Sequence, residues 1–179
     1  MDETTDIVET IPMASLTTNP IVTHDHATRL GTVRLAAQGD VLVGVWFADQ
    51  AALPAWAHQA TPCSRPPSVL AQAIGQIDAY CDGQRTVFDL PIGLVSGTPF
   101  QRMVWEALRA IPYGSTTTYR HIAAAVGRPL AVRATGAAIG RNPLCLVIPC
   151  HRVIGANGQL TGYAGGVSRK RELLAHEAG

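Results

Sequence analysis

An apolar run that stops at a proline and is followed by Cys-His-Arg constrains this chain more than any other stretch. The run Leu144–Ile148 leads into Pro149 and then into Cys150, His151 and Arg152. A short run of apolar, partly β-branched residues bounded by proline predicts a buried strand. Binding and catalytic sites are often built where strands end. We therefore expect a buried strand here, with Cys150 at its end and available for chemistry.

The two residues after Cys150 give it the surroundings of a reactive thiol. Cysteine is a nucleophile as the thiolate, and a nearby imidazole and a cation favour that form. His151 supplies the imidazole and Arg152 the cation, although Arg152 is expected mainly to anchor the turn. The alternative is that Cys150 is a small buried apolar residue and His151 a hydrogen-bonded core residue. Cys145, on the same predicted strand, is expected to be buried and inert.

Charge is distributed very unevenly along the chain. Residues 1–106 carry 11 acidic and 5 basic side chains, whereas residues 107–171 carry 9 basic and no acidic ones. A basic stretch is usually only a solvated face, but the complete lack of carboxylates over this block favours a polyanionic partner such as nucleic acid. Cys150 lies within this acid-free block.

Composition excludes several other classes of protein. With 179 residues, 47% of them hydrophobic, the chain can form one domain or two small ones. No apolar run reaches the roughly 18 residues that span a bilayer, and the acidic N-terminus differs from a signal peptide. The four cysteines, Cys63, Cys81, Cys145 and Cys150, form no CxxC pair. We expect a cytoplasmic protein with reduced thiols, no metal, no cofactor and no membrane partner.

The first part of the chain changes character near Ile21. Residues 1–20 are rich in Thr and acidic residues and predict a flexible tail. Further on, Thr32–Ala36 and Val41–Phe47 are joined by a turn that contains Gly39. Two such runs around a short turn predict an antiparallel hairpin.

The next stretch alternates irregular and regular segments. Residues 49–67 contain four prolines and predict an irregular surface loop. Ser68 is expected to cap a helix that ends near Gly83, because apolar residues recur there at helical spacing. Phe88–Ile92 predicts a short strand, and residues 93–97 a linker to a second domain.

Three helices are predicted in the second part. Thr98 and Gln101 form a capping box, with proline at the first helical position, ahead of an amphipathic helix. Ser115–Thr117 are expected to cap a second helix that ends at Gly127, and Ala131–Gly140 predicts a third. The second and third helices form a helix-turn-helix pattern, which alone is equally typical of an ordinary packed helix pair.

Several motifs resemble the O6-alkylguanine-DNA alkyltransferase family, in order along the chain. They are Thr98-Pro99-Phe100-Gln101, Ile111-Pro112-Tyr113-Gly114, Ala131-Val132-Arg133-Ala134, Arg141-Asn142-Pro143, Pro149-Cys150-His151-Arg152-Val153, Tyr163-Ala164-Gly165-Gly166 and Leu173-Leu174-Ala175-His176-Glu177. The match runs from about Thr98 to Glu177. A weaker resemblance extends back to the predicted hairpin. Ala164 departs from those relatives that have Ser there.

The resemblance implies a fold and a reaction. Residues 21–92 would form an α/β domain with a small antiparallel sheet plus a helix, ribonuclease-H-like. Residues 98–179 would form a mainly α-helical domain with a winged helix-turn-helix. The protein would flip O6-alkylguanine out of duplex DNA and transfer the alkyl group irreversibly to Cys150. It would act once, without a cofactor or a protein partner; activity on O4-alkylthymine stays open.

The resemblance also assigns roles to individual residues. Cys150 would be the nucleophile, His151 and Glu177 would take its proton, Asn142 would order the segment, and Tyr119 would protonate the leaving base. Arg133 would be inserted into the base stack, with Tyr119 crowding the phosphate. The other residues expected at DNA are Ala134, Gly136, Ala137, Arg128 and Arg141. Those expected around the flipped base are Tyr163, Val153, Ala164 and Gly165.

Two other functions remain to be weighed against this one. A Cys-His-Glu hydrolase would act on an acyl bond and would need an oxyanion hole, but it would not account for the acid-free block. A helix-turn-helix regulator or sensor of alkylated DNA would bind without chemistry. Such a regulator or sensor would be expected to have another residue in place of the nucleophilic cysteine, but Cys150 is present.

Overall fold

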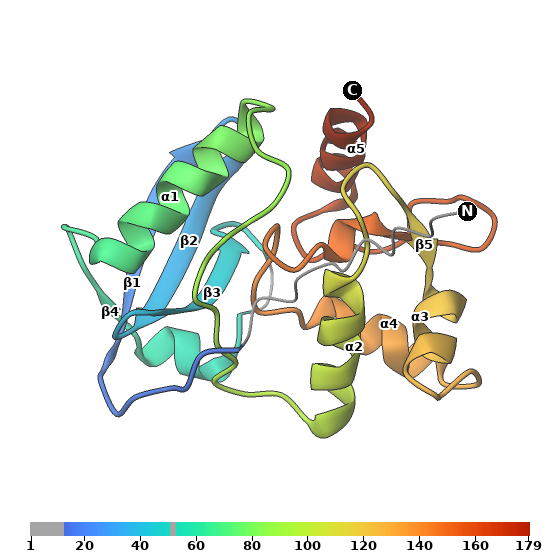
Figure 1. The fold of residues 1–179 in the computed structure, drawn as a ribbon, viewed down its shortest axis with the longest axis horizontal. Helices are drawn as coiled ribbons and strands as arrows, with labels where there is room; N and C mark the ends of the chain where they lie inside the picture. Colours follow the sequence, from blue (N-terminus) through green and yellow to red (C-terminus); the bar gives the residue numbers. More distant parts are fainter. Residues whose placement is uncertain (1–12, 51–52) are drawn as a thin grey trace, which may run out of the picture.

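The computed structural model describes residues 13–50 and 53–179 (Figure 1). A small sheet with one helix against it forms one side of the molecule, and four further helices gather on the other side. No helix in these ranges is both long and apolar enough to cross a membrane. Of the predicted tail, residues 1–12 lie outside the described residues. Residues 13–20 form neither helix nor strand, and the Ala14 amide donates to the Ile92 carbonyl at 2.8 Å.

The sheet has four strands in the order β3-β2-β1-β4. They are β1 (Ile21–Thr28), β2 (Gly31–Gln38), β3 (Val41–Phe47) and β4 (Thr61–Pro62). The first three are antiparallel, and β4 pairs in parallel with β1. The predicted hairpin is confirmed as β2 and β3, with Gly39 at a φ of 61° in its turn. β1 was not predicted, because its His and Asp residues mask the apolar alternation.

Two predictions for the segments around the sheet are wrong. The stretch 49–67 is not wholly irregular, since it contains the 3-10 helix η1 (Ala55–Gln59) and β4. Phe88–Ile92 is not a strand: only Ile92 pairs, with Leu42 of β3. Pro91 lacks an amide hydrogen, so this segment cannot extend its ladder of hydrogen bonds.

Helix α1 (Ser68–Cys81) lies against the sheet, where it buries Leu70 and Ile77. Its cap was predicted wrongly. Ser68 is the first helical residue, Pro67 occupies the capping position, and no side chain caps the helix. Gly83 follows the helix at a φ of 73°, in the left-handed region that glycine adopts without strain.

The other helices are α2 (Pro99–Arg109), α3 (Tyr119–Ala125), α4 (Val132–Gly140) and α5 (Val167–Glu177). The capping box of α2 is confirmed: the Gln101 amide donates to Thr98 Oγ1 at 3.2 Å, and the Thr98 amide to Gln101 Oε1 at 2.9 Å. The cap of α3 is Thr118 rather than a residue in 115–117, since Thr118 Oγ1 accepts from the His121 amide at 3.2 Å.

The predicted strand ahead of Cys150 is wrong. Leu144 makes a single parallel bridge to Val45 of β3, and the chain then turns through Leu146 at a φ of 72°. The 3-10 helix η2 (Cys150–Arg152) follows. Flanking prolines limit how far such a segment can pair. The apolar residues are therefore buried in a turn at the sheet edge.

Two short strands complete the second part. β5 (Thr117–Thr118) pairs in parallel with β6 (Val153–Ile154), which directly follows η2. This pairing joins the start of α3 to the residues just after Cys150.

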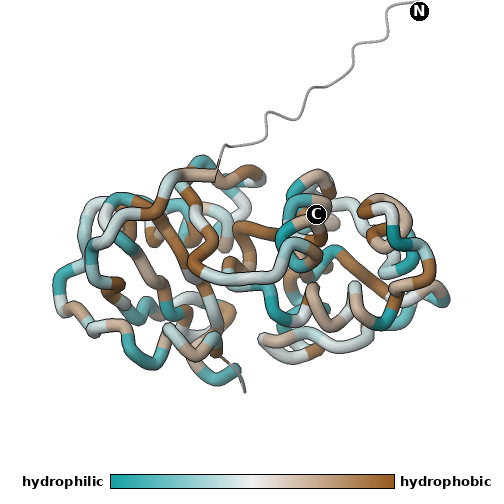
Figure 2. Tube along the Cα trace, turned by 90° about the horizontal axis from the view of Figure 1, so that it is seen from below, coloured by the Kyte–Doolittle hydropathy of each residue, from teal (hydrophilic) through white to brown (hydrophobic). Residues whose placement is uncertain are grey.

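Most of the core is one cluster that includes residues from the sheet, α1, α2, α5 and the segment before Cys150. A smaller cluster around Trp46 lies on the opposite face of β3. In Figure 2, hydrophobic stretches run through the middle of the molecule. Every residue of β3 is consequently buried, and the two parts of the chain share an interior.

Candidate active site

Cys150 begins η2, and only 4% of its surface is exposed. Its amide donates to the Ile148 carbonyl at 2.8 Å, which tightens the turn. Hydrogen bonding from the Cys145 thiol is the largest cause that lowers the pKa of Cys150; Asn142 and the positive charge of Lys170 add to it, while burial opposes it. The thiolate of Cys150 is therefore stabilised by its surroundings.

Asn142, just after α4, holds the chain ahead of Cys150. Its Nδ2 donates to the Ile148 carbonyl at 2.8 Å, and its Oδ1 accepts from the Leu144 amide at 3.0 Å. The side chain is buried and spans the turn from one side to the other. This contact fixes the direction in which the chain reaches Cys150.

His151 is completely buried and contacts Glu177 of α5, with 2.9 Å between Nε2 and Oε1. Burial lowers the pKa of His151, and it outweighs the raising effect of Glu177. The neutral imidazole then donates from Nε2 to the carboxylate and presents Nδ1 as an acceptor. Nδ1 has no hydrogen-bond partner in the part of the chain that the structure describes.

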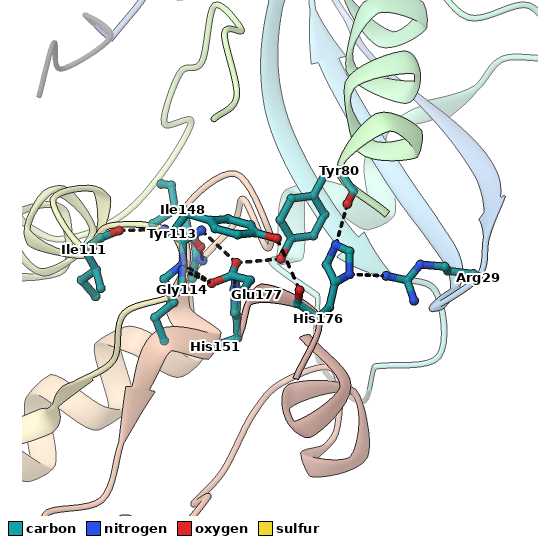
Figure 3. A network of polar contacts seen from close by, with 11 residues as sticks. Arg29, Tyr80, Ile111, Tyr113, Gly114, Ile148, His151, His176 and Glu177 are labelled. Atoms are coloured by element: carbon teal, nitrogen blue, oxygen red, sulfur yellow. Dashed lines mark hydrogen bonds and ion pairs between the residues drawn. The ribbon is translucent and has the colours of Figure 1, made fainter. Parts of the chain in front are cut away.

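The Glu177 carboxylate is the centre of a buried polar network (Figure 3). Arg152 donates to it with Nε and Nη2, each at 2.8 Å, and also to the Ile111 carbonyl at 2.7 Å. Tyr80 donates its hydroxyl at 2.7 Å and Gly114 its amide at 3.2 Å. Burial alone would raise the pKa of Glu177, but hydrogen bonds from His151 and Arg152 hold it well below its usual range. The expected anchoring role of Arg152 agrees with these contacts.

The sequence did not point to Tyr80 or Lys170. Lys170 on α5 is 1% exposed; its Nζ donates to the Val153 carbonyl at 2.5 Å and to that of Thr161 at 3.0 Å. Burial lowers the pKa of Lys170. A usable signal was present, because Lys170 shares the helical spacing of Leu173 and Glu177 and so lies on the buried face of α5.

Three of the four residues expected around the base, Tyr163, Ala164 and Gly165, line a cleft of about 710 Å³. Val153 lies elsewhere, in β6. A Cβ at Gly165 would come within 2.4 Å of the Phe47 ring, so the loop packs closely against β3. Burial raises the pKa of Tyr163, and the charges of Cys145 and Cys150 add to the rise, so this phenol interacts with both sulfurs.

Arg169 of α5 fixes this loop to the first part of the chain. Its guanidinium contacts both carboxylate oxygens of Asp49, at 2.9 and 2.7 Å, and donates to the carbonyls of Leu30 and Gly165 at 2.7 and 2.8 Å. It also lies over the Phe47 ring, 4.4 Å from the centroid. The cleft thus has walls from both parts of the chain.

A larger hollow of about 820 Å³ lies beside Pro149 and Arg152. It is lined mainly by apolar side chains of α2 and of the loops around it. Cys150, His151 and Glu177 line neither this hollow nor the Tyr163 cleft. We take the Tyr163 cleft as the candidate substrate site because three of the residues expected around the base line it, and because Tyr163 interacts with the Cys150 sulfur.

The residues expected at DNA lie mostly on one surface. Arg133, Ala134 and Ala137 are exposed on α4, and Arg128 and Arg141 are exposed at either end of it. The opposite face of α4 packs inward, where the Trp105 indole donates to the Ala138 carbonyl at 2.9 Å.

Tyr119, at the start of α3, packs against the same helix. A Cβ at Gly136 would be 3.7 Å from the Tyr119 ring. The hydroxyl donates to the Thr161 carbonyl at 3.4 Å, and Lys170 Nζ lies 5.8 Å from the ring centroid. Tyr119 therefore lies between the exposed helix and the buried site.

Fold and site together define a protein with a buried cysteine of lowered pKa beside a helix pair that carries exposed arginines. No group of three or more metal-ligating side chains occurs within residues 13–50 and 53–179. Residues 99–179 match the family model of the 6-O-methylguanine DNA methyltransferase, DNA binding domain. The methylated-DNA–protein-cysteine methyltransferase of Mycobacterium bovis is 46% identical over 148 residues, 83% of this chain and 87% of the relative.

Solved structures agree with this similarity. Mycobacterium tuberculosis OGT in complex with DNA matches with a TM-score of 0.79 at 42% identity, over 88% of this chain and 92% of that one. The O6-methylguanine-DNA methyltransferase of Pyrococcus kodakaraensis matches with a TM-score of 0.59 at 26% identity, over 89% and 99%. The chain belongs to the methylated-DNA–protein-cysteine methyltransferase family.

Proposed function

We propose that this protein repairs alkylated DNA directly, by moving the alkyl group from O6 of guanine to the sulfur of Cys150. The observation that carries the proposal is the buried Cys150, whose pKa is lowered, next to the His151–Glu177 pair. The basic, acid-free block that contains this site supports duplex DNA as the partner. Family membership supports the same reaction.

The transfer is a nucleophilic substitution at an sp3 carbon. The Cys150 thiolate forms a C–S bond while the C–O6 bond breaks, and the electron pair of that bond leaves with guanine. Tyr119 supplies the proton that makes the departing base neutral guanine. The product is a thioether, which offers no easily hydrolysed bond, so each molecule acts once.

Before the transfer, Cys150 must lose its proton. The free acceptor Nδ1 of His151 supports a path from the thiol through a water molecule to the imidazole. Glu177 stabilises the imidazolium that forms, and Arg152 keeps Glu177 ionised. Asn142 keeps the turn in position while the charge moves.

The target base must leave the duplex to reach a buried sulfur. In the proposed complex, α4 enters the minor groove, Arg133 takes the place of the rotated nucleotide, and Tyr119 crowds its phosphate. The small residues Ala134, Gly136 and Ala137 allow a close approach, and Arg128 and Arg141 contact phosphates. The exposure of all of these residues except the half-buried Tyr119 and Gly136 supports these roles.

The flipped base would occupy the cleft beside Tyr163. Tyr163 forms a wall of this pocket, the Ala164 backbone reads the edge of guanine, and Gly165 leaves room for the loop. Cys150 and Val153, whose backbone groups are proposed for the same edge, are not among the residues that line the cleft. The buried Tyr163 hydroxyl lacks a hydrogen-bond partner within the described residues, which supports its facing a polar ligand.

The finer description of the fold belongs to the same proposal. Residues 21–92 would be a ribonuclease-H-like domain, residues 93–97 a linker, and residues 98–179 a winged helix-turn-helix domain that carries the nucleophile. The β5–β6 pair beside α3 supports a wing. A cytoplasmic location fits a repair protein with reduced thiols.

The test is the mass of the protein and of its Cys150 peptide after mixing with a short duplex that contains O6-methylguanine. We expect one methyl group on Cys150 and no turnover beyond one equivalent. A protein that binds the lesion but stays unmodified would instead identify a damage sensor. Cys150→Ser is the matched variant and should bind the duplex without accepting the methyl group.

A further inference from the structure

The sheet-bearing part of the molecule forms a site for the guanidinium of Arg169, made by Leu30, Gly31, Phe47 and Asp49. Nε donates to the Leu30 carbonyl at 2.7 Å, and Nη1 and Nη2 donate to the two carboxylate oxygens of Asp49 at 2.9 and 2.7 Å. The group also lies over the Phe47 ring, 4.4 Å from its centroid. Gly31 has a φ of 109°, and a Cβ there would come within 2.9 Å of Nη2. Glycine at this position thus leaves the room that the guanidinium occupies.

Arg169 also holds the loop 163–166, which supplies one wall of the candidate cleft. Its Nη1 donates to the Gly165 carbonyl at 2.8 Å, so a single side chain connects this loop to the guanidinium site on the sheet. Within the loop, the Tyr163 carbonyl accepts from the Gly166 amide at 2.9 Å, which closes it as a turn. A shift of Arg169 would therefore move this turn relative to the sheet.

Phe47 connects Arg169 to Tyr163. The Phe47 and Tyr163 rings meet in an edge-to-face arrangement, with 6.4 Å between their centroids, while the guanidinium lies over the Phe47 ring. A Cβ at Gly165 would come within 2.4 Å of the Phe47 ring and 2.9 Å of the Tyr163 ring, so the loop packs tightly against both. The position of Tyr163, whose buried hydroxyl has no hydrogen-bond partner within the described residues, thus depends on contacts in which Arg169 takes part.

Stability alone does not account for the contacts of Arg169. The side chain of Asp49 is 64% exposed and that of Arg169 is 20% exposed, and an ion pair so open to water adds little to the free energy of folding. A guanidinium is, however, a planar fork that can donate to a carboxylate and to carbonyls at fixed angles. These contacts therefore specify where the loop lies more than they stabilise the fold.

We propose that Arg169 is a positioning residue for substrate binding, which holds the loop 163–166 against the sheet in the form that admits the flipped base. The inference rests on the proposed function, because it assigns Arg169 a part in binding the same base. The nucleophile is held by other contacts, around Asn142 and Glu177. Arg169 therefore acts on binding of the base and leaves the nucleophile unchanged.

The experiment compares wild type with Arg169→Gln, Arg169→Lys and Asp49→Asn. Methyl transfer to Cys150 from free O6-methylguanine base tests the pocket without base flipping, and the reaction of Cys150 with iodoacetamide tests the nucleophile without the pocket. Peptide mass follows both reactions, and amide hydrogen exchange reports how often the loop 163–166 opens. Arg171→Gln is the matched control, because it removes the same charge from an exposed position on the same helix. Melting temperatures show whether each variant is folded.

We expect Arg169→Gln to slow methyl transfer from the free base about tenfold, because the hydrogen bonds of a charged group that hold the pocket wall are lost, and to leave the iodoacetamide reaction unchanged. Arg169→Lys keeps the charge but not the planar fork, so its loss should be smaller. Asp49→Asn keeps the contacts with both carbonyls and should slow the transfer only about twofold. Loop exchange should become faster in Arg169→Gln, while Arg171→Gln should follow wild type throughout.

Equal rates of Arg169→Gln and wild type with the free base would overturn the inference. Equal slowing with iodoacetamide would overturn it too, because the nucleophile would then be affected, and so would an equal loss in Arg171→Gln, which would assign the effect to charge alone. If even wild type takes no methyl group, faster loop exchange in Arg169→Gln would support the loop-holding role and reject only the proposed function. Unchanged exchange in that case would reject both.

Discussion

Tyr80 of α1 donates a hydrogen bond of 2.7 Å to Glu177 of α5, 97 positions further along the chain. The carboxylate that orients His151 is therefore held from both parts of the molecule (Figure 3). Burial, reinforced by the negative charge of Glu177, raises the pKa of Tyr80 far above its usual value, so this phenol stays a donor. The sheet-bearing half thus contributes directly to the candidate active site.

Tyr80→Phe should test this link. The change removes the hydroxyl and keeps a ring that packs beside Phe88 and Tyr113. We expect the free energy of unfolding in urea to fall by about 1.5–3 kcal/mol, because the lost hydrogen bond is made to a buried charge. Tyr113→Phe is the control, since its hydroxyl lies at 3.5 Å from the His176 carbonyl; its loss should be less than about 0.5 kcal/mol. Equal losses of unfolding free energy in Tyr80→Phe and Tyr113→Phe would mean that the hydrogen bond to Glu177 adds no particular stability.

Gly114→Ala should damage both stability and the site. Gly114 has a φ of 71°, and a Cβ would come within 2.9 Å of the Glu177 carbonyl oxygen. We expect a loss above about 2 kcal/mol from strain and crowding together, and slower methyl transfer as Glu177 moves.

Gly127→Ala is the matched control for stability. Gly127 has nearly the same φ, 68°, but a Cβ there meets no atom within 4 Å. The free energy of unfolding of Gly127→Ala should therefore fall by about 1 kcal/mol, which is the cost of left-handed backbone at a non-glycine residue. If Gly114→Ala and Gly127→Ala lose the same free energy of unfolding in urea, crowding against Glu177 does not affect stability.

Stability should fall as the solution becomes acidic. The pKa of His151 is lowered in the folded protein by burial, so below about pH 6.5 the unfolded chain binds a proton that the folded one resists. The pKa of Glu177 is also lowered, so its contribution is complete above about pH 4.3 and is lost as pH falls further. Urea unfolding at several pH values measures both losses.

Glu177→Gln separates the two contributions. The variant should lose stability at neutral pH, because Arg152 is left buried without its counter-charge, and it should show a flatter dependence below about pH 4.3. Glu172→Gln changes an exposed carboxylate on the same helix. It should stay within about 0.5 kcal/mol of wild type. An unaltered acid dependence in Glu177→Gln would contradict the assignment.

Arg133→Ala should slow methyl removal from duplex DNA and spare the reaction with free O6-methylguanine base. The reason is that only extrusion of the nucleotide needs a side chain in the stack. Single-turnover rates with the two substrates measure this. Equal losses on both would mean that Arg133 does not act in base flipping.

Duplex binding should weaken steeply as salt rises, because Arg–phosphate contacts release counterions. Arg128→Ala should reduce the slope of log affinity against log salt by about one. Binding titrations at several salt concentrations supply the slopes. Affinity that is flat across that range would exclude a phosphate-based interface.

Local signals predicted the parts of the fold that depend on neighbours in sequence. The capping box at Thr98 and the turn around Gly39 are confirmed, because their hydrogen bonds join residues a few positions apart. The strand ahead of Cys150 was wrong, because its form depends on one bridge to Val45, far away in the chain, and on a left-handed leucine. Apolar composition predicts burial there but not the path of the backbone.

The candidate site also has a part that was expected from the sequence and a part that was not. Cys150, His151, Asn142 and Glu177 were expected from a family resemblance, and the structure brings them together around one turn. The partners of these residues could not be predicted. The helical periodicity around Tyr80 explains why its ring is buried, but it does not predict a partner for the hydroxyl. Its hydrogen bond to Glu177 joins residues 97 positions apart and exists only after folding.

The bridge between Val45 and Leu144 has a consequence for how copies of this protein behave in a crowded solution. β3 is the outermost strand of its sheet and is buried along its whole length, with residues around 92 and 144 paired to its open edge. An uncovered hydrophobic edge is a template for strands from other molecules. The segment that carries Cys150 therefore also covers the sheet edge and prevents self-assembly, and a substitution that loosens it would lower solubility as well as activity.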